Sequence, residues 1–142
     1  MSLLDFARTD VVTVAPSSTL AEAAKRMARE NVGCLVVEQD RKPVGILTDR
    51  DIVTRVVAKG GDPATLLVEQ VMTRRPITLA EELSLFEALE TMKSEGVRRF
   101  PVIDPEGNLS AFFTTDDVLH LLGIELAAVA GIIDAGIAVA DG

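Results

Sequence analysis

The sequence predicts a mixed α/β protein made of two copies of one β-α-β-β-α unit, packed as a pseudo-two-fold pair through their sheets. Three observations lead to this fold class. The chain repeats itself, each copy signals its first helix with a capping box, and each copy then has two closely spaced apolar runs of strand length. With 142 residues, 48% of them hydrophobic, the chain can bury a core in each copy.

A shift of 65 residues aligns the first half of the sequence with the second. The residues that recur are Thr13, Leu20, Glu22, Ala23, Met27, Glu30, Val32 and Val37, which fall on Thr78, Leu85, Glu87, Ala88, Met92, Glu95, Val97 and Val102. A shift of 66 places Thr48 and Asp51 on Thr114 and Asp117. The extra residue falls in the predicted turn 104–108, because turns absorb insertions most easily.

The first copy begins with an apolar strand over residues 11–14. Thr19 and Glu22 form a capping box that starts a helix, and apolar residues then recur at helical spacing. Strands are predicted over residues 34–38 and 44–47. A second helix follows and ends at Gly60-Gly61, a typical glycine stop.

The second copy repeats this order after a connection in which residues 66–72 predict a short leading helix. Its elements are a first strand over residues 77–79, a helix opened by Ser84 and Glu87, strands over 100–103 and 109–113, and a last helix ending near Gly123. The expected organisation is therefore a first motif over residues 1–61, a connection and second motif over 62–123, and an extension over 124–142.

The extension is strongly apolar, with Glu125 and Asp134 as the only charges between residues 124 and 139. A membrane span needs about 20 predominantly apolar residues, so this stretch predicts a helix that packs against the module or a second subunit. Elsewhere, the net charge of −8 argues against nucleic acid and against an anionic membrane surface. The N-terminus has no signal-peptide pattern, and the single cysteine, Cys34, favours a cytoplasmic setting.

Three stretches of the sequence resemble the CBS-domain family, whose motifs usually occur in pairs. Residues 68–73 with Pro76-Ile77-Thr78 are similar to the opening segment of the family, and Gly96–Asp104 is similar to its central strand. Gly45–Ile52 is similar to its closing strand-to-helix signature. The likeness covers residues 3–123. It implies two clefts between the sheets that bind AMP, ADP, ATP or a related adenosyl compound as a regulatory ligand.

The resemblance also implies which residues bind the nucleotide. Thr48 and Asp51, and in the second copy Thr114 and Asp117, would contact phosphate and ribose hydroxyls. The adenine would lie against apolar neighbours, either Val11, Val12 and Cys34 or Pro76, Ile77 and Phe100. Arg98 and Arg99 would supply positive charge to phosphates in one cleft only, because the first copy has Gly33 and Cys34 in their places.

The same residues have a simpler interpretation. A Thr-x-x-Asp sequence at a helix start is a common capping box, and spacing alone favours that role. Family resemblance favours a ligand, and the two roles can coexist. Arg98 and Arg99 could equally be surface residues exposed to solvent, so a phosphate-binding role and a surface role both stay open.

The sequence does not predict an enzyme. Cys34 and His120 are the only candidates for a nucleophile and a base, and each is isolated in the sequence. No metal-ligand spacing occurs, and Gly60-Gly61 lacks the lysine of a phosphate-binding loop. We therefore expect a regulatory adenine-nucleotide-binding module that needs no cofactor. The alternative is a ligand-free interaction module that dimerises or scaffolds a regulated partner protein.

Two further expectations concern packing. Apolar helix faces predict a homodimer, and their residues are Val53, Val56, Val57, Leu119 and Leu122. The cleft closed by Asp51 is expected to be the stronger one, because Gly45 leaves room for a ligand where the second copy has Ala111, followed by Phe112 and Phe113.

Overall fold

The computed structural model describes the backbone of residues 1–141 and the side chains of residues 1–136. Its first unit has the predicted β-α-β-β-α order. The elements are β1 (Thr13–Val14), α1 (Leu20–Glu30), β2 (Cys34–Gln39), β3 (Lys42–Thr48) and α2 (Asp49–Ile52), which continues as the π-helical turn η2 (Val53–Val57).

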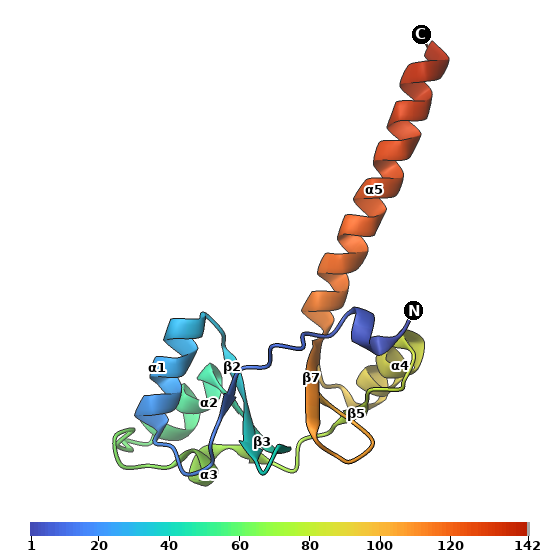
Figure 1. Ribbon diagram of the computed structural model, residues 1–142. Helices are drawn as coiled ribbons and strands as arrows, with labels where there is room; N and C mark the ends of the chain where they lie inside the picture. Colours follow the sequence, from blue (N-terminus) through green and yellow to red (C-terminus); the bar gives the residue numbers. More distant parts are fainter. Residues whose placement is uncertain (142) are drawn as a thin grey trace.

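The second unit repeats the order of the first. Its elements are β5 (Leu79–Ala80), α4 (Leu85–Glu95), β6 (Arg99–Ile103), β7 (Leu109–Thr114) and α5 (Thr115–Asp141). In both units the first strand is parallel to the second, and the second is antiparallel to the third. The sheets lie between α1 on one side and α4 on the other (Figure 1). The predicted fold class is confirmed.

Both capping boxes are formed. The Glu22 N–H donates to Thr19 Oγ1 over 3.2 Å, and the Thr19 N–H donates to the Glu22 carboxylate over 3.1 Å. Ser84 and Glu87 make the same pair of bonds at 3.2 and 3.0 Å. Each helix therefore starts at the residue that its sequence indicates, because the cap satisfies N–H groups that the helix itself leaves unpaired.

The segments that lead into each unit complete the core of the other unit. The 3₁₀ turn η1 (Leu3–Asp5) places Leu3 and Phe6 in the core of the second unit. Helix α3 (Val68–Val71) places its two valines in the core of the first. Strand β4 (Thr73–Arg74), which follows α3, then joins the first sheet beside β3, giving the order β1-β2-β3-β4.

Helix α5 differs from the sequence expectation. It does not end near Gly123 but continues to Asp141 and projects away from both units (Figure 1). A single helix-interior glycine costs about 1 kcal/mol, and the alanine- and leucine-rich flanks outweigh that cost. From Gly123 to Gly136 every residue is exposed, so this part of α5 does not pack against the module.

The continuity of α5 also removes the argument that the apolar stretch is too short to cross a membrane. By length and composition alone, Thr115–Gly136 is long and apolar enough to do so, with a mean hydropathy of 1.8.

The apolar helix faces expected from the sequence also need one correction. Val53, Val57 and Leu119 are exposed, whereas Val56 is fully buried and Leu122 is half-buried. Val56 packs in the core of the first unit.

Candidate functional site

Two clefts lie between the units. The first has a volume of about 580 Å³ and is lined by Ile46, Thr48, Asp51, Thr73, Arg75, Pro76, Ile77, Gly96, Val97, Arg98, Arg99, Thr114, Thr115 and Asp116. The second measures about 210 Å³ and is lined by Arg8, Asp10, Val11, Val12, Asn31, Val32, Gly33, Cys34, Val36, Arg99, Phe112, Thr114, Asp116 and Asp117. Pockets for small molecules and cofactors usually measure about 300–1,000 Å³. Only the first of these two clefts falls within that range.

Each cleft combines the closing signature of one unit with the segment that leads into the first strand of the other, and the second cleft also includes Cys34 of β2. Thr48 and Asp51 meet Pro76 and Ile77 in the first cleft. Thr114 and Asp117 meet Val11, Val12 and Cys34 in the second. All the site residues expected from the sequence thus line one cleft or the other. Phe100 is the exception among their proposed neighbours, because it is fully buried in the core of the second unit.

Asp51 takes part in the capping box that the simpler interpretation predicts. The Asp51 N–H donates to Thr48 Oγ1 over 3.1 Å, and the Thr48 N–H donates to Asp51 Oδ2 over 3.0 Å. The other oxygen, Oδ1, has the Arg55 guanidinium at 3.7 Å. This contact is too long for a strong hydrogen bond. One carboxylate oxygen of Asp51 is therefore engaged by the cap, while the other is held only by a loose ion pair.

Asp117 has a different environment, although it occupies the equivalent position. Its N–H donates to Thr114 Oγ1 over 3.1 Å. The guanidinium of Arg8 donates to Asp117 Oδ1 through Nη2 at 2.8 Å and through Nε at 3.1 Å. This pairing raises the pKa of Arg8. Among the described side chains, buried Asp117 Oδ2 has no hydrogen-bond partner.

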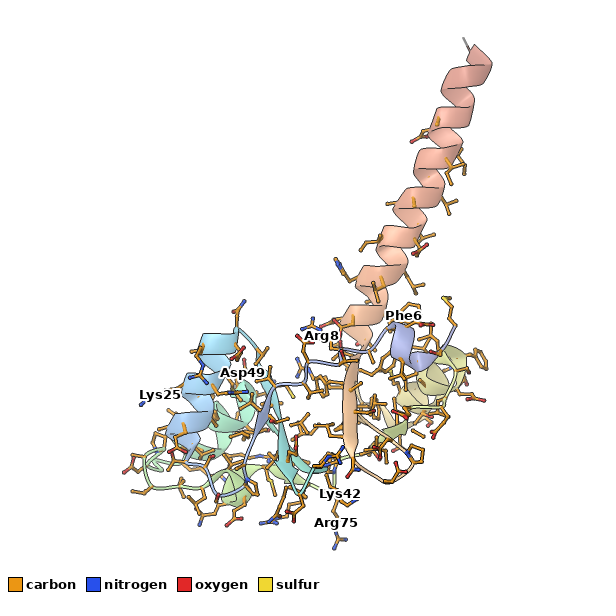
Figure 2. The ribbon with its side chains drawn as sticks, viewed as in Figure 1. Phe6, Arg8, Lys25, Lys42, Asp49 and Arg75 are labelled. Atoms are coloured by element: carbon orange, nitrogen blue, oxygen red, sulfur yellow. The ribbon has the colours of Figure 1, made fainter. Side chains whose placement is uncertain are left out.

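Sequence reasoning missed Arg8, which lies 109 residues from Asp117. Backbone pairing holds it in place, because Arg8 and Phe112 exchange N–H···O bonds of 2.8 Å in each direction. The internal repeat relates the backbone pairing of Arg8 to a pairing in the first unit. The shift of 65 that aligns the halves places Arg8 on Thr73, and Thr73 pairs with Ile46 of β3 as Arg8 pairs with Phe112 of β7. Figure 2 shows Arg8 at the base of α5, between the units.

The charges of the two clefts differ in sign. Three arginines and two aspartates line the first cleft, whereas two arginines and three aspartates line the second. Arg98 and Arg99 face the first cleft, and Arg99 also borders the second. Arg75 was not expected from the sequence. It lies at the rim of the first cleft, and its side chain extends toward solvent (Figure 2).

Cys34 borders the second cleft as an unreactive thiol. Burial raises its pKa to about 11, and the positive charge of Arg99 opposes this only in part. A thiol acts as a nucleophile in its thiolate form. At neutral pH the Cys34 side chain is protonated and contributes a small apolar surface to the cleft.

The expected role of Gly45 is wrong. A Cβ atom at this position would collide with Met72 Sδ and would lie 3.0 Å from the carbonyl oxygen of Thr73. Glycine is therefore needed for the close approach of α3 and β4 to β3, and not for a ligand. In the second unit, Arg8 forms only an isolated bridge beside β7, and Ala111 is accommodated in the core.

Comparison with known proteins shows the same two units. The family model described as CBS domain matches residues 4–58 and 68–124. The CBS domain-containing protein YhcV of Bacillus subtilis is 36% identical over 82% of this chain and 82% of its own length. An uncharacterized protein of Methanopyrus kandleri is 34% identical over 85% of this chain, but the chain spans only 62% of that protein. It spans 20% of the Arabidopsis thaliana protein CBSCBSPB3.

Solved structures with the same fold include Hypoxic Response Protein I, which holds two coordinated zinc ions. It is 30% identical, with 84% of this chain and 98% of the other covered and a TM-score of 0.74. Within the described residues of this chain, no group of three His, Cys, Asp or Glu could hold a metal ion. The CBS domain pair of protein MJ0100, solved with 5′-methylthioadenosine and S-adenosyl-L-methionine, is 24% identical over 86% of this chain and 99% of its own, with a TM-score of 0.74.

Proposed function

This chain belongs to the CBS-domain family, and from that premise we propose that it is a regulatory module whose first cleft binds an adenine nucleotide or a related adenosyl compound. The observation that carries the proposal is the composition of this cleft. It joins a carboxylate, Asp51, to Arg98 and Arg99 in a volume of about 580 Å³. The fold can hold such ligands, as the adenosyl-bound pair of MJ0100 shows for that protein.

Each part of a nucleotide finds matching chemistry in the first cleft. The guanidinium groups of Arg98 and Arg99 suit phosphate oxygens, which they bind in a forked geometry. Asp51 Oδ1 accepts ribose hydroxyls, as an acidic residue does in dinucleotide-binding folds. Ile46, Pro76 and Ile77 provide an apolar wall for the base. A nucleotide would thus exchange the loose Arg55–Asp51 contact for shorter hydrogen bonds.

The proposal is tested by calorimetric titration of the full chain with AMP, ADP, ATP and S-adenosylmethionine. About 23 heavy atoms at roughly −0.3 kcal/mol each correspond to a dissociation constant on the order of 10 μM. The absence of heat and of thermal stabilisation with all four compounds would refute the proposal.

Asp51→Ala locates the site. Loss of a charged acceptor costs about 1.5–3 kcal/mol, which is a roughly 10- to 150-fold weaker affinity for the best ligand. Because the substitution also breaks a capping box, the matched control is Glu87→Ala, which breaks the box of α4 outside both clefts. We expect Glu87→Ala and Asp117→Ala to leave the tight binding phase nearly intact. Equal losses in all three variants would show a general effect of destabilisation.

A second observation favours an interaction function alongside the first. Exposed residues on α5 follow a heptad spacing, with Leu119, Leu126 and Ile133 seven residues apart and Val129 between them. We propose that α5 pairs with α5 of a second copy to form a homodimer. Glu125 and Asp134 lie within the apolar stretch, and an aspartate at a bilayer centre costs about 2.5–3.5 kcal/mol. At the rim of a helix pair, both remain in water.

Light scattering tests the homodimer, since one chain has a mass of 15.2 kDa. We expect twice that mass for the full chain and the monomer mass for Leu126→Asp. Ile124→Asp, which lies outside the stripe, is the control and should leave the dimer intact. A monomer at all concentrations that partitions into neutral lipid vesicles would instead assign α5 to a membrane.

A further inference from the structure

The two clefts are equivalent by the internal repeat, yet only in the second does a charged side chain make hydrogen bonds to the central carboxylate. Arg8 Nη2 lies 2.8 Å from Asp117 Oδ1, whereas the nearest cation to Asp51 lies at 3.7 Å. Under the shift of 65, the residue of the first cleft that corresponds to Arg8 is Thr73. Thr73 carries no charge, so Asp51 Oδ1 keeps only the loose contact with Arg55, which also donates to Thr73 Oγ1 over 3.3 Å.

Several contacts hold Arg8 in the second cleft. Two backbone hydrogen bonds of 2.8 Å join Arg8 to Phe112. Next to them, Leu3 and Phe6 anchor the N-terminal segment in the core of the second unit. The Asp117 side chain is 14% exposed and that of Arg8 is 62% exposed, so the pair depends on its two short hydrogen bonds more than on exclusion of water. The fold therefore fixes the Arg8 backbone beside β7, and two hydrogen bonds hold its guanidinium on Asp117.

Asp117 nevertheless keeps an unused acceptor. Oδ2 is buried and lacks a hydrogen-bond partner among the described side chains. Leaving such an oxygen unpaired is costly, and proteins usually satisfy it. A hydroxyl group in the second cleft would do so. Arg8 thus occupies Oδ1 of the carboxylate, whereas Oδ2 remains available to accept a hydroxyl.

We propose that Arg8 is a built-in competitor that excludes adenosyl ligands from the second cleft, so that the chain binds one ligand, in the first cleft. This inference rests on the proposed function and adds the stoichiometry and the residue that sets it. The guanidinium takes the place of the ribose hydroxyls on Asp117. With Arg8 in place, the cleft measures about 210 Å³, which is below the usual range for small-molecule sites.

The charge of the second cleft determines which probe would enter once Arg8 is removed. Without Arg8, Asp10, Asp116 and Asp117 would face Arg99 alone. A phosphate would be repelled there, whereas an uncharged nucleoside would not. Adenosine is therefore the probe for the released cleft.

The test is calorimetric titration of the full chain with adenosine, for the wild type and for Arg8→Ala. We expect one equivalent for the wild type and two for Arg8→Ala. The control is Arg29→Ala, because Arg29 also makes an ion pair, is similarly exposed (65% against 62% for Arg8) and lies outside both clefts. It should bind one equivalent.

The other possible results distinguish an error in the role of Arg8 from an error in the proposed function. Two equivalents for the wild type would overturn the role of Arg8 and leave the proposed function standing. One equivalent for Arg8→Ala, with an unchanged melting temperature, would also overturn it. Loss of one of two wild-type equivalents in Arg8→Ala would show that Arg8 binds the ligand instead of excluding it. No binding of adenosine or AMP by any variant would refute the proposed function itself, and this inference with it.

Discussion

Gly45 is a position at which neighbouring residues determine which amino acid can fit. A Cβ atom there would press on Met72 and on the Thr73 carbonyl, so the chain needs glycine for α3 and β4 to lie against β3. The sequence indicates only that the repeat has Gly45 in one copy and Ala111 in the other. It could not reveal that the counterpart of β4 in the second unit is only the isolated bridge between Arg8 and Phe112, which leaves room for alanine.

We therefore expect Gly45→Ala to destabilise the fold by about 1–3 kcal/mol, the usual cost of overpacking. Urea denaturation measures the change. Gly123→Ala is the control, because Gly123 lies in the interior of α5 with nothing within 4 Å of its would-be Cβ. That substitution should be neutral or stabilising by up to about 1 kcal/mol. Equal stability of Gly45→Ala and wild type would contradict the packing described for β4.

Cys34 gives a prediction that depends on pH. Because burial raises its pKa to about 11, the thiolate that reacts with iodoacetamide is scarce at neutral pH. In the native protein the alkylation rate should still rise roughly tenfold per pH unit between pH 8 and 10, where an ordinary thiol with a pKa of about 8.5 levels off. Denatured protein is the control. A native rate that levels off near pH 9 would rule out the raised pKa.

At the scale of elements, the turn between β6 and β7 confirms the position of the extra residue. Asp104 Oδ1 accepts the N–H groups of Glu106 and Asn108 at 3.0 and 2.8 Å, and Gly107 takes a positive φ of 85°. The hydrogen bond from the Asn108 backbone is the main cause of a lowered pKa for Asp104. The carboxylate form is thus the one that the folded turn favours.

This lowered pKa determines how the stability should depend on pH. A folded-state pKa below the unfolded value of about 3.9 contributes stability above that pH. The contribution is lost as the pH falls through the folded pKa. Asp104→Ala should therefore lower the melting temperature at pH 7, and its deficit should shrink as the pH is lowered below about 4. Glu106→Ala, in the same turn, is the control. A deficit that does not change with pH would mean that the Asp104 charge has no part in the turn.

The elements that the sequence predicts correctly are those marked by a local signal. Thr19 and Ser84 mark helix starts because a cap depends on residues only three positions apart. The two-residue strand β4 and the Arg8–Asp117 pair depend on segments that meet only after folding, so no local pattern indicates them. The sequence expectation that α5 ends near Gly123 is wrong for a related reason. A glycine stops a helix only where a left-handed turn follows, as at Gly96, and Gly123 has no such turn.

For the whole molecule, the exchange of leading segments makes the two units depend on each other. Leu3 and Phe6 correspond to Val68 and Val71 under the shift of 65, and each pair completes the core of the unit that does not follow it in the chain. Backbone hydrogen bonds also join each segment to the unit whose core it completes. The Leu3 N–H donates to the Leu83 carbonyl over 3.1 Å, and the Val68 N–H donates to the Ser18 carbonyl over 2.8 Å. The clefts between the units are thereby held at a fixed spacing.

This exchange predicts that a substitution near the N-terminus weakens the C-terminal unit. Phe6 is 7% exposed, and Phe6→Ala should cost about 3–5 kcal/mol because it leaves a cavity in the second core. Hydrogen exchange measures where the loss occurs, and we expect amides of α4, β6 and β7 to lose protection first. Val71→Ala is the mirror control and should first expose amides of α1, β2 and β3. If Phe6→Ala instead released protection mainly in α1 and β2, the N-terminal segment would belong to the unit that follows it, and the crossed cores would be wrong.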